Sequence, residues 1–559
     1  MTFLFEKFVF IIGAIILAIF LFIYKNEINK INNNLLCFFK AKTNLIWLII
    51  IFFIFWFFCY FYPDIYYTPW TGATLGDNFL YLLNSFNNNN YYYQTHLFYP
   101  FVPFKIYELF KKFNLIFNEN DPDFMFKIIP FFSLPVKLFS LIGLLYAYKI
   151  LKKITNSIFE QILGMFFIAV TFAFWLWSIQ PNGRGLAISF SFVVIYYLIK
   201  LSEDLFLINY IIIGLLCSMA IFIHIGLIYF IIGVALIVCF YSIRKYYKIK
   251  NNKLLLGVFI FIIINSIFLI IYYFLLVYKY NTYSLSKLIY NISEPWNYGA
   301  IKLGMNFFKL FFIDSIGSIL GMLLGVQYKF SYKIKPLYED IILMIQLGII
   351  LNVLSNVIFL KFKKIAEQKY FLIIFFSFVF TLIGFSIRKT WINHYNLIIP
   401  AITLLILFFS FNKSIFKDKL LFHLQIIILI ITMFYINGFG FISVLHGNNY
   451  KDNILYNKFN LLKYYTQNKK TILYENDLDD WTKEQIYRYA TETKISLLKN
   501  ITLFTKNDIE KQILQEFYNN YDLLITPAKY TNKILYSKKE SIALPCDDTF
   551  EKYYIFYNY

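Results

Sequence analysis

The stretch LLLGVFIFIIINSIFLIIYYFLLVY, residues 254–278, decides the fold because it contains no charged side chain. A helix of about 20 apolar residues is long enough to cross the hydrocarbon core of a bilayer. A helix also satisfies its backbone hydrogen bonds internally, as a spanning segment must. Residues 254–278 are therefore predicted to form a membrane-spanning helix.

Similar apolar runs recur on both sides of this helix, at 8–24, 45–62, 128–150, 157–179, 186–200, 207–223, 226–243, 340–360, 370–387, 395–411 and 420–444. The run at 307–326 carries Asp314 and three glycines spaced four apart, so the sequence leaves open whether it crosses the membrane or is re-entrant. The predicted fold class is an all-α polytopic membrane helical bundle of about 12 transmembrane helices, with a small C-terminal α/β soluble domain.

The composition agrees with a membrane protein: hydrophobic residues make up 59% of the chain and charged residues 15%. The net charge of +20 is unevenly placed, because residues 446–559 hold 16 Lys and Arg against 15 Asp and Glu. The excess positive charge therefore lies between the spans, as expected when Lys and Arg collect in cytoplasmic loops. The basic residues form no stripe, which argues against nucleic-acid binding. Five cysteines without a CxxC pair argue against a disulfide framework or a zinc site.

The tail changes character at His446 and alternates strand-like and helix-like segments. Strands are predicted at 471–475, 495–504 and 522–526, and helices at 481–491 and 508–518. We therefore predict two domains: a transmembrane domain at 1–445 and a small α/β domain at 446–559. The tail contains no GxGxxG motif and no phosphate-binding loop.

A long polar and aromatic loop at 63–127 separates two spans, and short helices are predicted in it at 77–86 and 103–113. Asp77 opens the first helix, so it either acts as a base toward a hydroxyl or only caps the helix. Asp64, at the membrane exit, is a weaker rival. His96, later in the loop, either donates to a phosphate or is simply solvated.

Two further places between spans carry cations. Arg184 lies in the turn Asn182-Gly-Arg-Gly185, where a guanidinium would bind phosphate or reach toward lipid headgroups. The segment Arg388-Lys-Thr-Trp-Ile-Asn-His-Tyr395 is either a second phosphate site or an ordinary interfacial belt with basic anchors. His224, in another turn, is interpreted as a packed or capping residue rather than a catalyst.

The order of these features resembles the GT-C superfamily of membrane glycosyltransferases, especially the aminoarabinose and protein O-mannosyl transferases. Asp77-Asn78 stands where the family has an Asp-Glu pair, and Tyr99-Pro100 with His96 stands at the later Lys-Pro or His-Pro. Arg184 with Leu186-Ala187 resembles the family's Arg at the start of an external-side span. Tyr395-Asn-Leu-Ile-Ile-Pro400 resembles its Tyr-Leu-Leu-Pro motif.

This resemblance implies an inverting enzyme that takes a sugar from a polyprenyl-phosphate carrier, with loop 63–127 and domain 446–559 outside the cytoplasm. It implies Asp77 as the catalytic base and Arg184, Arg388 and Lys389 as ligands of the lipid phosphate. His96, Tyr99, His394 and Tyr395 would complete the substrate and phosphate contacts.

The resemblance also bears on cofactors, partners and location. No resident cofactor is expected from the residues, and the metal-using branches of the family imply a divalent ion, Mg²⁺ or Mn²⁺. The partners would be the lipid-linked donor, membrane lipids and a glycan, lipid or protein acceptor. The chain would reside in the plasma or inner membrane, or in the endoplasmic reticulum of a eukaryote.

Two other functions remain open. Arg184 followed by Ala220-Ile-Phe-Ile-His224, together with Gly76-Asp77 and Tyr81, also resembles membrane polysaccharide polymerases and ligases, which use lipid-diphosphate-linked glycans. Those proteins usually lack a soluble α/β tail. A lipid or glycan transporter is the second alternative, although no internal repeat is seen and Asp314 is the single plausible mid-span acid.

Overall fold

The computed structural model describes residues 101–113, 124–179, 183–280, 369–388, 397–411, 420–435, 454–467, 469–475, 500–505, 510–527, 538–546 and 549–558. It also describes short pieces between 283 and 353 and residues 491 and 498. The predicted spans at 8–24 and 45–62, the loop helix at 77–86 and most of the runs at 307–326 and 340–360 lie outside these residues.

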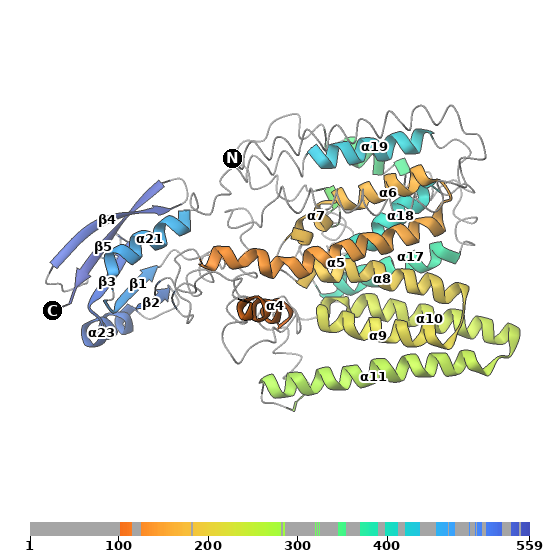
Figure 1. Ribbon diagram of the computed structural model, residues 1–559, viewed down its shortest axis with the longest axis horizontal. Helices are drawn as coiled ribbons and strands as arrows, with labels where there is room; N and C mark the ends of the chain where they lie inside the picture. Colours follow the sequence, from red (N-terminus) through yellow and green to blue (C-terminus); the bar gives the residue numbers. More distant parts are fainter. Residues whose placement is uncertain are drawn as a thin grey trace. The chain divides into compact units, whose positions relative to one another are not determined.

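The helical part consists mostly of apolar helices that run side by side, whereas the amphipathic helix α4 lies across their direction (Figure 1). Their bounds are α4 Phe101–Lys112, α5 Phe124–Ile154, α6 Ile158–Val170, α7 Phe172–Ile179, α8 Gly183–Glu203, α9 Leu207–Ile223, η2 Ile225–Leu227, α10 Ile228–Ile249, α11 Asn252–Tyr280, α17 Lys369–Arg388, α18 Ile399–Phe411 and α19 Leu420–Phe434. The predicted spans from 128 to 278 and from 370 onward each correspond to one or two of these helices.

Four of the described helices are long and apolar enough to cross a membrane: Leu134–Ile154, Gly183–Glu203, Ile228–Ile249 and Asn252–Tyr278. A fifth candidate is the pair α6 and α7, which together occupy the predicted span at 157–179. The chain bends by 65° between the two helices, so the pair is either one broken span or a re-entrant loop, and the bend was not predicted from the sequence. At the break, the Thr171 hydroxyl donates to the carbonyl of Ile168 at 2.8 Å, so the side chain competes with the helical hydrogen-bond ladder.

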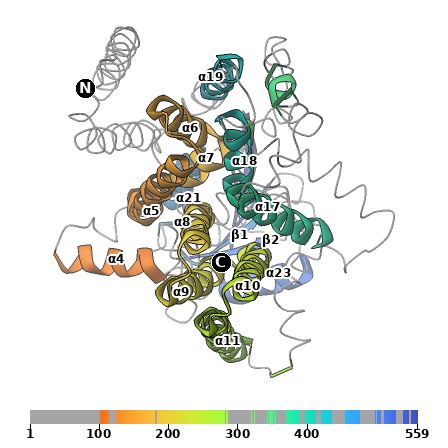
Figure 2. The same ribbon diagram turned by 90° about the vertical axis from the view of Figure 1, so that its right-hand side faces the viewer.

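Helix α8 lies at the centre of the described helices, next to α5, α9, α10, α17 and α18 (Figure 2). Within its apolar window 83% of the residues are buried, whereas the corresponding share in α11 is 17%. Helix α11 therefore has the burial expected of a helix that faces lipid, although it is the most apolar of the four. The close approach of α5 and α8 depends on Gly143, because a Cβ there would lie 2.8 Å from the Cα of Ser189.

The directions of the helices fix which ends share a side. Helices α5, α8 and α10 end at one side, called here the basic end because it carries Lys149, Lys200 and the run Arg244 to Lys253. Helix α17 runs antiparallel to α10. Gly233 of α10 packs against Phe380 of α17, and Tyr229, earlier in α10, packs against Gly384, later in α17. Helix α19 starts beside the start of α6, where His423 Nε2 lies 3.1 Å from Glu160 Oε1. The side that carries the start of α8 is called the Arg184 end.

The C-terminal part is a five-stranded sheet in the order β2-β1-β3-β5-β4 (Figure 1). Its elements are α21 Ile454–Thr466, β1 Thr471–Glu475, β2 Ile501–Thr505, α23 Glu510–Asn520, β3 Leu523–Pro527, β4 Lys538–Cys546 and β5 Thr549–Tyr557. Strands β2, β1 and β3 are parallel, whereas β5 is antiparallel to both β3 and β4.

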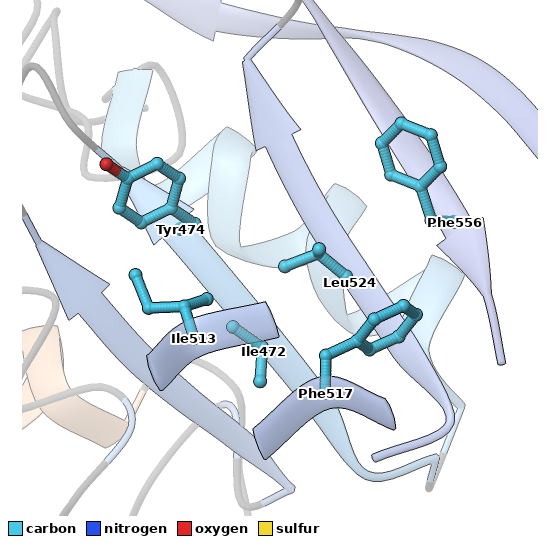
Figure 3. Packing of buried hydrophobic residues seen from close by; sticks show 6 residues of the cluster. All are labelled: Ile472, Tyr474, Ile513, Phe517, Leu524 and Phe556. Carbon is cyan, nitrogen blue, oxygen red and sulfur yellow. The ribbon is translucent and has the colours of Figure 1, made fainter. Parts of the chain in front are cut away.

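A different helix covers each face of the sheet. Successive side chains along a strand point to opposite faces, so each strand contributes residues to both. Ile472 and Tyr474 of β1, Leu524 of β3 and Phe556 of β5 pack against Ile513 and Phe517 of α23 (Figure 3). Glu475 and Tyr553 point to the opposite face, where they meet Lys458 of α21. The result is a helix–sheet–helix sandwich.

The tail was predicted in part. Strand β1 has the predicted bounds, and α23 and β3 are shifted by one or two residues from their predicted places. Strand β2, Ile501–Thr505, covers only the second half of the predicted strand at 495–504. Helix α21 and the hairpin of β4 and β5 were not predicted from the sequence. The predicted helix at 481–491 lies outside the described residues except for Thr491.

Candidate functional site

Arg184 is the second residue of α8 and is buried, with 4% of its surface exposed. Its guanidinium carbon lies 4.7 Å from the ring centroid of Trp177, which is fully buried in α7. A cation over an indole face is attracted by the negative face of the ring. The aromatic ring therefore stabilises a charge that would otherwise be costly to bury.

Gly185 explains how Arg184 reaches that ring. A Cβ at this position would lie 2.2 Å from the carbonyl oxygen of Trp177 and 2.4 Å from a methyl group of Val136. Only glycine permits so close an approach between the start of α8 and α7. The space beside Gly185 is therefore filled by the protein itself and is not open to a ligand.

The indole N–H of Trp177 is a second polar group at this place. Its nitrogen is buried and has no hydrogen-bond acceptor among the described residues. Leaving such a group unsatisfied costs about 1–3 kcal/mol, so native proteins seldom do so without a ligand or water to accept the bond. Trp177 was not singled out from the sequence, since a Trp within an apolar run looks like ordinary core. Its place just before the turn that carries Arg184 was the available signal.

His224 forms the turn between α9 and η2, at the Arg184 end. It is 1% exposed, its backbone N–H donates to the carbonyl of Ala220, and its ring Nδ1 accepts the N–H of Gly226 at 2.9 Å. This matches the interpretation of His224 as a packed, turn-forming residue. Because Nδ1 is an acceptor, a neutral ring carries its proton on Nε2.

Packing brings several helix ends together around this side. Leu186, two residues after Arg184, packs with Val136 and Ile223, so the turn of His224 is close to the start of α8. A Cβ on Gly226 would lie 3.0 Å from Leu397, so the start of α18 adjoins the same turn. Gly384, near the end of α17, meets Tyr229 at the start of α10. The Arg184 end therefore also receives the end of α17.

Among the sequence-predicted site residues, the structure describes the side chain of Arg184 alone. Arg388 is the last residue of α17, and its backbone lies at the Arg184 end. Asp77, His96, Tyr99, Lys389, His394 and Tyr395 lie outside the described residues. Their roles stay predictions.

The electrostatics of this end favour an anion. A helix N-terminus carries a partial positive charge of about half an elementary charge, so a cation there is unfavourable for the helix itself. Arg184 adds a buried full charge at the same place. An anion such as a phosphate would be attracted by both. The described residues contain no group of three His, Cys, Asp or Glu side chains that could hold a metal ion.

Long apolar helices around a buried cation define an integral membrane protein of the helical-bundle class. No protein-family model and no curated protein matches the sequence. The fold, however, is that of ArnT from Cupriavidus metallidurans. Its crystal structure bound to undecaprenyl phosphate aligns over 92% of this chain and 98% of that chain, with 10% identity and a TM-score of 0.55. The apo structure aligns over the same shares, with 11% identity and a TM-score of 0.52.

This likeness extends over the helices and the C-terminal sheet alike, since it covers nearly the whole of both chains. The fold expected from the sequence resemblance is therefore confirmed by this likeness, which at 10–11% identity concerns the fold alone. The predicted number of about 12 transmembrane helices stays a prediction.

Proposed function

We propose that the chain is a multi-pass membrane glycosyltransferase of the GT-C type. It moves a sugar from a polyprenyl-phosphate carrier to a hydroxyl or amine of a glycan, lipid or protein acceptor. The proposal is supported by the likeness to a structure that binds undecaprenyl phosphate. A lipid-linked donor also needs no nucleotide-binding fold, and the sequence has no GxGxxG motif.

The observation that carries the proposal is the buried Arg184 above Trp177 at the start of α8. A guanidinium binds a phosphate through two parallel hydrogen bonds, and the indole N–H offers one more donor nearby. These groups would hold the carrier phosphate and stabilise the negative charge that it gains as it leaves the sugar. Arg388, Lys389, His96, Tyr99, His394 and Tyr395 are proposed to complete the contacts to donor and phosphate.

In the proposed reaction, the acceptor oxygen or nitrogen attacks the anomeric carbon from the face opposite the phosphate. The bond between that carbon and the phosphate oxygen breaks, and the oxygen keeps the electron pair. The acceptor proton passes to Asp77, provided that Asp77 comes within hydrogen-bond reach. Attack from the opposite face inverts the anomeric configuration. As an alternative role, the resemblance implies that Asp77 would bind Mg²⁺ or Mn²⁺, as in the metal-using branches of the family.

The charge distribution supports an extracytoplasmic site. The basic end carries Lys152, Lys153, Lys200 and the run from Arg244 to Lys253, and such clusters stay in the cytoplasm. Arg184 and Lys200 are 16 residues apart on one helix, which corresponds to about 24 Å. Arg184 would therefore lie near the opposite membrane surface.

A polysaccharide polymerase or ligase is the second candidate. It is favoured by one observation, the nearness of the His224 turn to the start of α8 that carries Arg184. The two candidates differ in the donor, which is a single sugar on a monophosphate in the first case and an oligosaccharide on a diphosphate in the second.

The test compares wild type with Asp77→Asn and Arg184→Gln, expressed to equal levels in membranes. Labelled polyprenyl-phosphate sugars are supplied together with glycan, lipid and peptide acceptors, and loss of donor is followed with formation of glycosylated product. Asp204→Asn is the matched control, because Asp204 is an exposed acid at the basic end.

Wild-type membranes and Asp204→Asn should transfer the sugar. Arg184→Gln should lower kcat/KM by about 10²–10³-fold, the usual effect of removing one charge-stabilising donor. Asp77→Asn should abolish transfer. If single-sugar donors stay intact while oligosaccharide-diphosphate lipids are consumed, the polymerase function replaces the first proposal. Turnover of neither donor class, with all three acceptor classes supplied, points to the transporter.

A further inference from the structure

A second cluster of polar side chains lies at the basic end of the bundle, on the neighbouring helices α5 and α8. Its core is three tyrosine rings: Tyr146 of α5 lies edge-on to Tyr196 of α8 at 5.3 Å, and Tyr196 lies edge-on to Tyr197 at 5.4 Å. The ring centroids of Tyr146 and Tyr197 are 6.0 Å apart. These contacts fix the rings in one group, called here the tyrosine cluster.

Two lysines are held against the tyrosine cluster. Lys149 Nζ lies 4.3 Å from the ring centroid of Tyr146 and 5.5 Å from that of Tyr196. Lys200 Nζ lies 5.8 Å from the ring centroid of Tyr197. Both lysines are half-buried, whereas Lys245 and Lys248 on α10, at the same end, are exposed. The aromatic rings therefore hold two ammonium groups near one another at the end of the helix pair.

The positive charge of Lys149 and Lys200 is not neutralised by a carboxylate among the described residues. The nearby acid, Glu203, is engaged elsewhere: Lys153 Nζ donates to its Oε2 at 2.8 Å, and the Tyr370 hydroxyl donates to its Oε1. Lys152 lies over a different ring, that of Tyr148, at 4.9 Å. Lys149 and Lys200 consequently add two charges for which the described helices offer no acid.

The place of the cluster indicates the chemistry of its ligand. Both helices are candidate membrane spans, so their basic ends lie where lipid headgroups begin. Tyrosine suits this boundary because its ring is apolar and its hydroxyl is polar. A phosphodiester would accept from both ammonium groups and from the hydroxyls. We propose that Lys149, Lys200 and the tyrosine cluster bind the phosphate of an anionic phospholipid, in the leaflet opposite the Arg184 end.

This lipid site is separate from the proposed transferase site and does not depend on it. The test uses the full chain in nanodiscs of mixed phosphatidylcholine and phosphatidylglycerol. Bound phosphatidylglycerol is counted by native mass spectrometry after release from the discs. The variants are Lys149→Gln/Lys200→Gln and, as a matched control, Lys245→Gln/Lys248→Gln, which removes the same charge from exposed positions at the same end.

The first variant should lower the affinity for phosphatidylglycerol by about a hundredfold, because each charge-assisted hydrogen bond from a lysine to the phosphate contributes about tenfold. The control should keep the lipid bound, and excess inorganic phosphate should not displace it. Equal losses in both variants, or no loss in either, would overturn the proposal in favour of diffuse attraction. Displacement by inorganic phosphate would overturn the assignment to a lipid.

A folding defect is separated from a binding defect by a second variant. Tyr196→Phe keeps the ring and its packing but removes a hydroxyl that can donate to phosphate. We expect it to elute as wild type on gel filtration and to bind phosphatidylglycerol several-fold more weakly. Unchanged binding would show that the Tyr196 hydroxyl does not contact the phosphate.

Discussion

At the scale of single residues, the contact between Arg184 and Trp177 is the most informative one. A buried guanidinium over an indole gains about 0.5–2 kcal/mol, and the face of Phe attracts cations less strongly than that of Trp. Trp177→Phe keeps an aromatic ring but also removes the buried N–H donor. We expect carrier affinity to fall by about three- to thirtyfold, from these losses combined. The measurement is a titration of purified protein with polyprenyl phosphate.

Trp175→Phe provides the control for this substitution. Trp175 is also buried in α7, two residues away, and its ring lies 6.4 Å from that of Phe172. This variant should bind the carrier as wild type does. If both variants lose the same affinity, the effect comes from packing in α7 and not from the contact with Arg184.

At the scale of helices and strands, the sequence predicted best the bounds of elements that end in polar turns. Helix α9 has the predicted bounds, Leu207–Ile223, because Asp204 precedes it and His224 ends it. The break between α6 and α7 was missed, since the apolar pattern continues through Thr171, whose hydroxyl donates to the carbonyl of Ile168 at the break. Strand β4 was missed because Pro545 and the charged Lys538 to Glu540 disfavour a strand. In the structure it is an edge strand, where both are tolerated.

The candidate site was predicted less completely than the helices, for a physical reason. Arg184 was found because a cation in a glycine turn is visible in the sequence. Trp177 and the helix ends around His224 meet Arg184 only through packing between helices. No periodicity within one helix encodes which neighbour its end will touch.

The α/β sandwich offers a prediction at this same scale. Lys458 Nζ lies 2.7 Å from Glu475 Oε1 and donates to the Tyr553 hydroxyl at 2.9 Å, and that hydroxyl donates to Glu475 Oε2 at 2.9 Å. All three side chains are buried. Glu475→Gln leaves the ammonium without its counter-charge, which costs about 3–5 kcal/mol for a buried pair. We expect faster hydrogen exchange in β1 and β5 of the full chain.

Glu516→Gln is the control for the ion pair, because Glu516 is an exposed acid on α23 in the same domain. Exposed pairs contribute about 0–1 kcal/mol, so its exchange should match wild type. Slow exchange retained in β1 and β5 of Glu475→Gln would show that the buried charges do not hold the sheet to α21.

At the scale of the whole molecule, helix directions constrain the path of the chain. Helix α11 returns from the basic end, so Tyr280 lies at the Arg184 end, and α17 starts again from the basic end. We therefore predict one crossing between Tyr280 and Lys369, by the span at 340–360, with the run at 307–326 re-entrant. Helix α19 starts beside Glu160 at the basic end and runs back. The tail should therefore emerge on the same side as Arg184.

Cysteine labelling tests this orientation. In a chain whose five native cysteines are replaced by serine or alanine, Asn251→Cys marks the basic end and Gln512→Cys marks the tail, since both positions are exposed. A maleimide that cannot cross membranes should label Gln512→Cys in intact cells. Asn251→Cys should react only after permeabilisation, because the basic end is retained in the cytoplasm. If both positions react only after permeabilisation, the tail is cytoplasmic. The transferase site and the tail then lie on opposite sides of the membrane, and the predicted number of crossings after α11 is wrong by one.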